Sequence, residues 1–222
     1  MASTIDAVTI INKASQILGD ASQTYWTASE LLGWLNDGQI EIALLNPNSK
    51  TVTKSIQLVA GAKQSAPSDS IRIIEFVRNM GMTGLIPGNA IRQIERKILD
   101  RYQPNWSLDT PDAVVVHAMY NAEDDNETFY VWPPQPTTPS YIEIIYCQLP
   151  TLITNSNVGT KITLDDYYQN TLVDYVLYRA FGRSTENADN YKRSNDHYKI
   201  FKDMLTVKLE NDYNANNNIP TK

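Results

Sequence analysis

The spacing of hydrophobic positions changes twice along the chain. In residues 1–47, apolar side chains recur at helical spacing in two stretches, which predicts a helical pair. In residues 51–150 the period is two, which predicts strands, and residues 163–210 return to the helical period. The pattern predicts an α+β fold in which helical pairs from both chain ends form a helical body, with a central antiparallel β region and a projecting hairpin.

Local signals set the expected ends of the N-terminal helices. Thr4 is the expected N-cap of the first helix, and Gly19 lies where a left-handed residue would end it. Thr27 and Glu30 have the spacing of a capping box, which predicts the start of the second helix. That helix should end at Asn46, because a proline follows it.

The C-terminal part has similar signals. Thr163 and Asp166 form a second start of the capping-box type, and Gly182 is expected to end that helix. A last helix should begin near Thr185 or Asn187. We expect one domain over residues 1–222, with an N-terminal helical pair (1–47), a β-rich middle with the hairpin (51–150), a C-terminal helical pair (163–210) and an extended, Asn-rich tail (211–222).

Residues 111–150 predict a three-stranded meander. In the expected strands, alternate residues share a face: Val114, Val116, Ala118 and Tyr120 in the first, Phe129 and Val131 opposite Tyr130 and Trp132 in the second, and Ile142, Ile144 and Tyr146 in the third. The turn between the first two strands holds Glu123, Asp124, Asp125, Asn126 and Glu127. Carboxylates without partners stay in water, so this tip should project outward.

Charge and composition narrow the function. The net charge of -6 and the pI near 4.9 argue against a protein that wraps nucleic acid. Cys147 is the chain's one cysteine, which excludes an internal disulfide, and no signal peptide or membrane-spanning run is evident, so a soluble intracellular chain is expected. Glycines in residues 80–89 lack the spacing of a phosphate-binding loop, which favours an exposed irregular loop.

One basic segment keeps an alternative open. Residues 90–102 contain Arg92, Arg96, Lys97 and Arg101 with carboxylates between them. A solvated element of mixed charge is the favoured interpretation, and a nucleic-acid patch is the alternative.

The residues do not form a recognisable catalytic or metal site. His117 falls on an expected strand and His197 on an expected helix, and neither has a partner motif for nucleophilic or zinc chemistry. Asp165 and Asp166 are adjacent carboxylates, but a helix start explains both. We therefore expect no catalytic residue, no cofactor and no metal, and a subunit whose function is contact.

The order of these parts resembles the head-to-tail adaptor, or connector, proteins of short-tailed bacteriophages, of the tail tubular protein A type. The matching stretches are VTIINKASQILGD, TASELLGWLNDGQIEIALLNP, LDRYQPNW, FYVWPPQP and DDYYQNTLVDYVLYRAFGRS, followed by a terminal helix. The resemblance covers most of the chain.

The resemblance implies a virion protein at the head-to-tail junction, made and assembled in the host cytoplasm. It implies a homo-oligomeric ring, usually of twelve copies, that binds beneath the portal protein, carries the tail nozzle or tail tube protein and extends the DNA channel. DNA would pass through the lumen without specific binding, and no membrane is involved.

On this basis we expect two contact regions. The portal-docking residues are expected to be Tyr191, Tyr198, Phe201, Leu205 and Tyr213, and the tip from Glu123 to Glu127 is expected to contact the next tail component. Two alternatives stay open: a nucleic-acid-binding phage protein that uses the basic segment, and a tail-associated hydrolase in which Asp165 or Asp166 faces another carboxylate.

Overall fold

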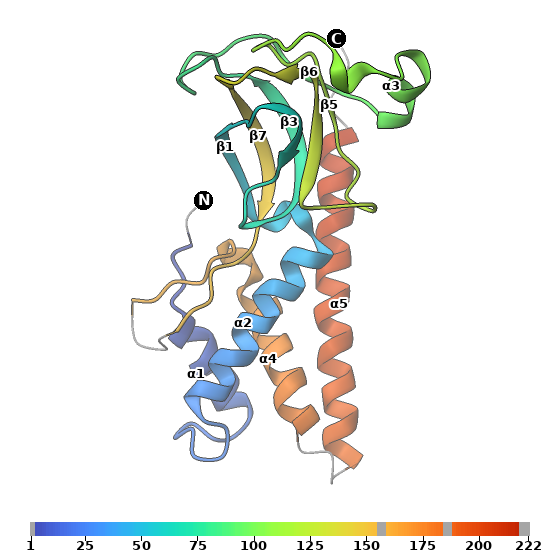
Figure 1. The fold of residues 1–222 in the computed structure, drawn as a ribbon. Helices are drawn as coiled ribbons and strands as arrows, with labels where there is room; N and C mark the ends of the chain where they lie inside the picture. Colours follow the sequence, from blue (N-terminus) through green and yellow to red (C-terminus); the bar gives the residue numbers. More distant parts are fainter. Residues whose placement is uncertain (1–2, 155–158, 184–187, 218–222) are drawn as a thin grey trace. The chain divides into compact units, whose positions relative to one another are not determined.

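The chain leaves its helical part at Lys50 and returns to it at Pro150. A computed structural model describes residues 3–154, 159–183 and 188–217 (Figure 1). It divides the chain into a helical unit, Met1–Lys50 with Pro150–Lys222, and a β unit, Thr51–Leu149. The β unit ends one residue before the expected end of the β-rich middle at residue 150. The α+β class is confirmed. The expectation of one domain over residues 1–222 stays a prediction.

The helical unit is organised around one central helix. Its elements are α1 (Ala7–Ile17), α2 (Ala28–Leu45), η1 (Pro47–Lys50), η3 (Asp166–Tyr168), α4 (Gln169–Arg183) and α5 (Ala188–Asn217). α4 packs against α1, α2 and α5, and the helices bury one continuous apolar core that includes Leu35 and Phe201 (Figure 1). The expected helical body, built from both chain ends, is therefore confirmed.

Local signals placed α2 correctly. Thr27 accepts the backbone N–H of Glu30, and the Glu30 carboxylate in turn accepts the backbone N–H of Thr27, which is a complete capping box. Asn46 is the C-cap, as expected from the proline that follows it. Gly19 has a φ of 72°, the left-handed conformation expected after α1.

α2 and α4 approach each other closely at Gly38. A Cβ at this position would lie 2.8 Å from Cδ1 of Tyr175 and 3.2 Å from Cδ2 of Leu172. The Tyr175 ring is itself packed against Phe201 of α5, with a centroid distance of 5.1 Å. The absence of a side chain at Gly38 therefore lets α2, α4 and α5 share one layer of the core.

The β unit consists of two small sheets. Its elements are β1 (Thr51–Gln57), β2 (Gly61–Ser65), β3 (Ser70–Asn79), β4 (Arg92–Gln93), α3 (Arg96–Tyr102), η2 (Trp106–Leu108), β5 (His117–Met119), β6 (Thr128–Gln135) and β7 (Tyr141–Gln148). One sheet has the order β1-β7-β3 and the other β2-β6-β5-β4. All pairs are antiparallel except the two-residue pairing of β4 with β5, which is parallel.

Alternating residues of the two sheets form the β core. Phe129 and Val131 are buried whereas Tyr130 and Trp132 are half-buried, as the period of two predicted. Phe129 packs against Phe76 of the other sheet with a centroid distance of 5.1 Å. The two sheets thus bury their apolar faces against each other.

The predicted three-stranded meander is wrong in two respects. β7 does not pair with β6, because it pairs with β1 on one side and β3 on the other. The first strand is also shorter than predicted, and Val115 is buried in place of Val114 and Val116. The Asn79 side chain accepts the N–H of Val115 and donates to its carbonyl, at 2.8 Å each, so a side chain takes the place of a neighbouring strand here.

The predicted extended tail is wrong for residues 211–217, because α5 continues as a helix to Asn217. No glycine or proline interrupts residues 188–217, and each residue added to an existing helix gains a hydrogen bond at a small cost in propensity. The expected start of this helix, near Thr185 or Asn187, and residues 218–222 lie outside the described residues.

The close approach at Gly38 predicts opposite effects for two glycine substitutions in α2. Gly38→Ala should lower the free energy of unfolding by about 1–3 kcal/mol, because the added methyl group displaces the buried Tyr175 ring. Gly33→Ala is the matched control: the space that its methyl group would enter is open, with no neighbouring side chain within 4 Å, so it should raise the free energy of unfolding by about 0.5–1 kcal/mol. Urea unfolding measures both, and a Gly38→Ala protein as stable as Gly33→Ala would contradict the packing.

Candidate functional site

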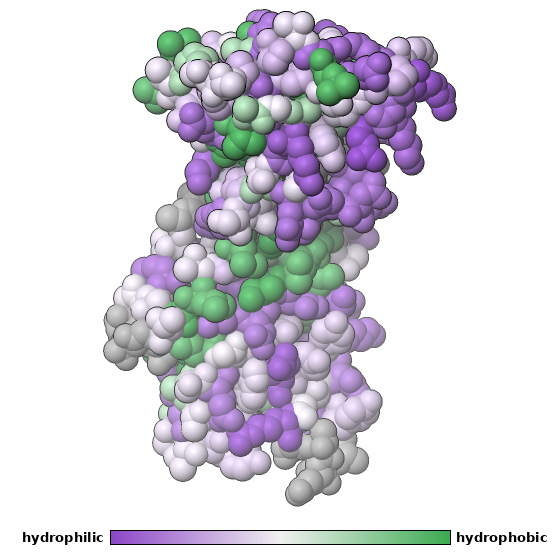
Figure 2. Space-filling view, in the orientation of Figure 1, coloured by the Kyte–Doolittle hydropathy of each residue, from purple (hydrophilic) through white to green (hydrophobic). Residues whose placement is uncertain are grey.

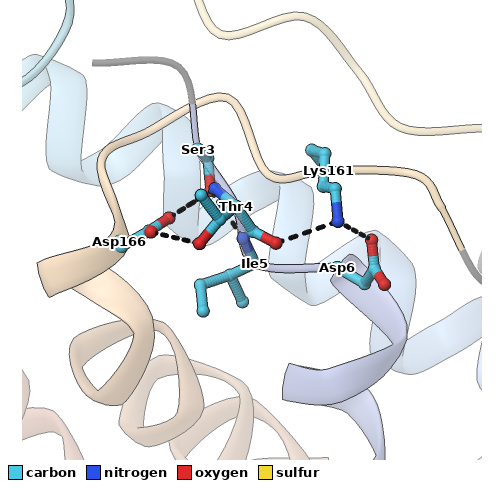
Figure 3. A network of polar contacts seen from close by, with 6 residues as sticks. All are labelled: Ser3, Thr4, Ile5, Asp6, Lys161 and Asp166. Carbon is cyan, nitrogen blue, oxygen red and sulfur yellow. Dashed lines mark hydrogen bonds and ion pairs between the residues drawn. The ribbon is translucent and has the colours of Figure 1, made fainter.

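A polar network fastens the N-terminal segment to the start of the η3–α4 helix (Figure 3). The Asp166 carboxylate accepts hydrogen bonds from the Ser3 hydroxyl at 2.6 Å, the Thr4 hydroxyl at 2.5 Å and the Thr4 N–H at 2.8 Å. Lys161 donates to the Thr4 carbonyl and forms a 2.6 Å ion pair with Asp6. Residues more than 150 positions apart in sequence are therefore joined by charge-assisted hydrogen bonds.

This network corrects two predicted caps. Thr4 is not the N-cap of α1, because Asp6 occupies that position, and the Thr4 side chain binds Asp166 instead. Asp166 does not complete a capping box with Thr163, because its carboxylate is taken by Ser3 and Thr4 while Thr163 donates to Gln39. The donors around Asp166, first the Ser3 hydroxyl and then Thr4, lower the pKa of its carboxyl from 3.8 to about 2.

The two histidines have structural surroundings. His197 forms a 2.8 Å contact from Nδ1 to an Asp174 carboxylate oxygen and stacks on Phe181, which ties α5 to α4. His117 stacks on Trp132 of β6. His197 thus contacts α4 through both a carboxylate and an aromatic ring, and His117 contacts β6 through its ring.

An apolar groove lies between the start of α4 and the second half of α5, and we call it the α5 groove. It has a volume of about 620 Å³. Its lining consists of Tyr167, Tyr168, Asn170, Thr171, Ile200, Asp203, Met204, Val207, Lys208 and Asn211. Ile200, Met204 and Val207 recur at helical spacing, and each is more than a third exposed. This stripe of α5 thus has no covering helix among the described residues.

The expected portal-docking residues differ in their exposure to solvent along α5. Phe201 and Leu205 are buried in the core of the helical unit, where they hold α5 against α4. Tyr191 is exposed, and Tyr198 is half-buried against Tyr178 and Phe201. The side chain of Tyr213 lies outside the described residues. Tyr191 and the apolar stripe of the groove are therefore exposed on α5, whereas Phe201 and Leu205 are not.

A second apolar surface lies at the C-terminal end of α2, and we call it the α2 ridge. It comprises Ile40, Leu44 and Leu45, of which Leu44 is 58% exposed. Figure 2 shows apolar side chains gathered over the C-terminal half of α2. Ile40 and Leu44 lie opposite the face that buries Leu31, Leu35 and Ile42, so α2 is apolar on two faces.

The hairpin tip and the basic segment lie close together in the β unit. All five tip residues are exposed. Asp125 accepts hydrogen bonds from the Thr128 hydroxyl and from the N–H groups of Glu127 and Thr128, and these donors, the hydroxyl first, lower the pKa of its carboxyl. Asp124 and Asp125 line a cavity of about 310 Å³ with Arg96 and Lys97. Arg96 also pairs with Asp100 at 3.6 Å and lies over the Tyr130 ring. Positive and negative charges therefore share this surface.

The loop of residues 80–89 is irregular, as predicted, and most of it is exposed, although Met80 and Gly84 are buried. Gly81 and Gly84 have positive φ, and a Cβ on Gly84 would lie 2.9 Å from the Tyr141 ring. Tyr141 and Gly81 share a backbone hydrogen bond of 2.9 Å. In this loop, Leu85 and Ile86 are exposed to solvent.

Both apolar surfaces of the helical unit have a signal in the sequence. Ile40 and Leu44 of α2, and Ile200, Met204 and Val207 of α5, are apolar positions outside the stripe that packs inward. Apolar residues on a second face of a helix are the mark of such a surface.

The described residues form neither a metal site nor a membrane-spanning helix. In residues 3–154, 159–183 and 188–217, the histidine, cysteine and carboxylate side chains do not gather in threes as metal ligands would. None of the helices in that part of the chain combines the length and apolar character needed to span a bilayer.

Comparison with known proteins identifies the chain's relatives at the level of a family. The family model described as SU10 adaptor protein matches residues 5–220. No curated protein matches the chain.

The network at Asp166 predicts a specific dependence of stability on pH. Because its folded pKa, about 2, lies below the ordinary value of 3.8, Asp166 stabilises the fold above pH 4, and this contribution is lost as the pH falls toward 2. Asp166→Asn should therefore be less stable than the wild type near neutral pH, and the two should converge toward pH 2. Urea unfolding at a series of pH values measures this.

The control for that series is Asp196→Asn, at an exposed position of α5. It should keep the pH dependence of the wild type between pH 4 and 2. A constant difference between Asp166→Asn and the wild type over this range would show that the carboxylate does not act through its ionisation.

Proposed function

Since the chain belongs to the SU10 adaptor protein family, it is a structural adaptor protein of a phage, and we propose that it forms a ring that joins the portal vertex of the capsid to the tail and extends the DNA channel. The observation that carries the proposal is the family match over residues 5–220. An adaptor binds other virion proteins. Its surfaces should therefore be built for contact.

The helical unit supports a role in assembly. Its α2 ridge and its α5 groove are apolar and exposed, on two different parts of one unit. Exposed apolar surfaces of this kind are typical of protein contacts. A ring needs two different faces on each subunit, one for each neighbour, and the helical unit has two candidates.

The charge distribution supports passage of DNA without binding. The chain carries a net charge of -6, so its surface repels phosphate on average. At the basic segment, Arg96 and Lys97 share a cavity with the carboxylates of Asp124 and Asp125. A DNA backbone at this surface would meet carboxylates beside the cations, which favours the adaptor over the nucleic-acid-binding alternative.

Asp166 gives no support to the hydrolase alternative. Its carboxylate accepts hydrogen bonds from Ser3 and Thr4, and these donors keep it ionised. A general acid needs a raised pKa, and a general base needs free access to a proton of the substrate. The surroundings of Asp166 meet neither need.

We place the portal contact near the start of α5, with Tyr191 as its anchor. Tyr191 is 61% exposed, and tyrosine is among the residues that dominate binding energy at interfaces. Phe201 and Leu205 contribute indirectly, because their burial fixes the helix that carries Tyr191. The tip from Glu123 to Glu127 is proposed to contact the next tail component.

Native mass spectrometry tests the proposed function. The purified chain is measured alone and after mixing with the matching portal ring. Many copies should load onto each portal ring, because the ring offers repeated sites. Binding to DNA at low salt with no binding to the portal would overturn the adaptor ring in favour of the basic segment.

Tyr191→Ala refines this measurement. It should weaken portal loading by roughly tenfold or more, as expected for an interface anchor. Tyr102→Ala is the matched control, since Tyr102 is 82% exposed but belongs to α3 of the β unit. Equal loading of the two variants would remove Tyr191 from the portal contact while leaving the adaptor function in place.

The tip is tested by removing charge without removing its turn. Glu123→Gln, Asp124→Asn and Glu127→Gln together keep Asp125, whose side chain holds the turn through Glu127 and Thr128. If the tip faces a tail component, attachment of that component should weaken by roughly tenfold, on the order of 1.4 kcal/mol. Attachment is measured by co-sedimentation with assembled particles, and an unchanged level would assign the contact elsewhere.

A further inference from the structure

We propose that the α2 ridge of one copy inserts into the α5 groove of a second copy, which makes this pair the contact between neighbours in the ring. The inference rests on the proposed function, because only an assembly of copies needs such a contact. Its occupant is a second copy of this chain, and the contact involves the helical unit alone. The shape, position and charge of the two surfaces support it.

The ridge has the form of an insert. Leu44 and Leu45 are adjacent at the end of α2, and Ile40 lies one turn before Leu44. Leu44 has 58% and Leu45 37% of its surface in contact with water, whereas Leu31, Leu35 and Ile42 of the same helix are buried. A single exposed leucine is ordinary, whereas three neighbouring apolar residues at one helix end form a surface that gains from burial.

The groove has the form of a receptor for such an insert. Ile200, Met204 and Val207 form one wall, and Tyr167, with Lys208 over its ring at 4.9 Å, forms part of the other. A volume of about 620 Å³ is large enough to receive several side chains. Apolar anchors spaced one turn apart on a helix are the usual occupants of a groove of this kind.

The two surfaces lie at the same level of the helical unit. α2 ends at Leu45, and the next residue, Asn46, donates a hydrogen bond of 3.1 Å to the hydroxyl of Tyr168. Tyr168 is itself part of the groove lining, which includes no residue of α2. The ridge and the groove are therefore made of different residues, and the hydrogen bond of Asn46 to Tyr168 brings the end of α2 to the level of the groove.

That arrangement favours a second copy as the occupant. A contact between two different surfaces repeats from copy to copy, and it closes into a ring when each step is a rotation with little rise. Ridge and groove at one level place successive copies side by side. A groove for an unrelated partner would not need a matching ridge on the same unit at the same level.

The charged residues that line the groove have no net charge, so the affinity of the contact should come mainly from burial of apolar surface. Lys208 and Asp203 both line it, so their formal charges cancel. Contact between copies should therefore depend weakly on salt, unlike a contact made through charges.

Cross-linking in the assembled particle tests the contact. Leu44→Cys and Val207→Cys are introduced together into the full chain, and tailed particles are treated with a short bis-maleimide. Cys147 is buried, so the native thiol adds little background. The double variant should give a ladder of covalent multimers, while each single variant should stay monomeric.

Three outcomes would overturn the inference. These are a double variant that stays monomeric, a link within one chain that shifts its mobility without a ladder, and a link from either cysteine to a different protein. In each case, detection of the wild-type chain in tailed particles would leave the proposed adaptor function standing. Absence of the chain from tailed particles would instead overturn the proposed function itself.

Charge substitutions give an independent readout. Leu44→Asp and Met204→Asp should each reduce the number of copies loaded per particle by roughly tenfold or more, since each puts a carboxylate into a closed apolar contact. Ile17→Asp is the matched control, because Ile17 is 57% exposed on α1, outside both surfaces, and it should load as the wild type does. Unfolding midpoints of all three variants establish that the fold is intact, and normal loading of Leu44→Asp or Met204→Asp would contradict the contact.

Discussion

The helical unit depends on the packing of α4 against helices from the other end of the chain. α1 and α2 come from the first 45 residues, and α4 begins at Gln169, with the whole β unit between them. The close approach of Gly38 to Tyr175, and the network that joins Ser3 and Thr4 to Asp166, hold these distant segments together. Because α5 packs on α4, the position of every surface of the helical unit proposed for assembly follows from this closure.

Elements whose signals are local could be predicted from the sequence. The capping box of Thr27 and Glu30 involves residues three apart, and no distant group displaces it. The same pattern at Thr163 and Asp166 failed because the chain's N-terminal segment supplies stronger donors to Asp166. A cap predicted from spacing is therefore reliable only when no tertiary partner captures the carboxylate.

The strands show the same division between local and distant information. Alternation correctly separated Phe129 and Val131 from Tyr130 and Trp132, since the period of two is a property of the strand itself. It did not reveal that β7 pairs with β1 and β3, because pairing is chosen by segments far away in sequence. The alternating pattern also does not predict the hydrogen bonds between the Asn79 side chain and the backbone of Val115.

The hydrophobic period predicted α5, but it did not show which apolar residues of that helix pack in the core and which stay exposed. Phe201 and Leu205 belong to the stripe that packs inward, and Ile200 and Met204 lie one position before them on the exposed side. An apolar residue that packs in its own core and one that packs against another chain have the same chemistry, so sequence spacing alone does not separate them.

The stripe of α5 that packs in the core leaves the second apolar stripe of the helix exposed to solvent. The buried contacts of Phe201 and Leu205 set the rotation of the helix, so Met204 and Val207 must face outward beside Tyr167. Under the proposed contact, the α2 ridge of a neighbour would fill that space, and the core of one copy would then determine the geometry of the next. A substitution in the core, such as Gly38→Ala, would in that case disturb assembly as well as stability.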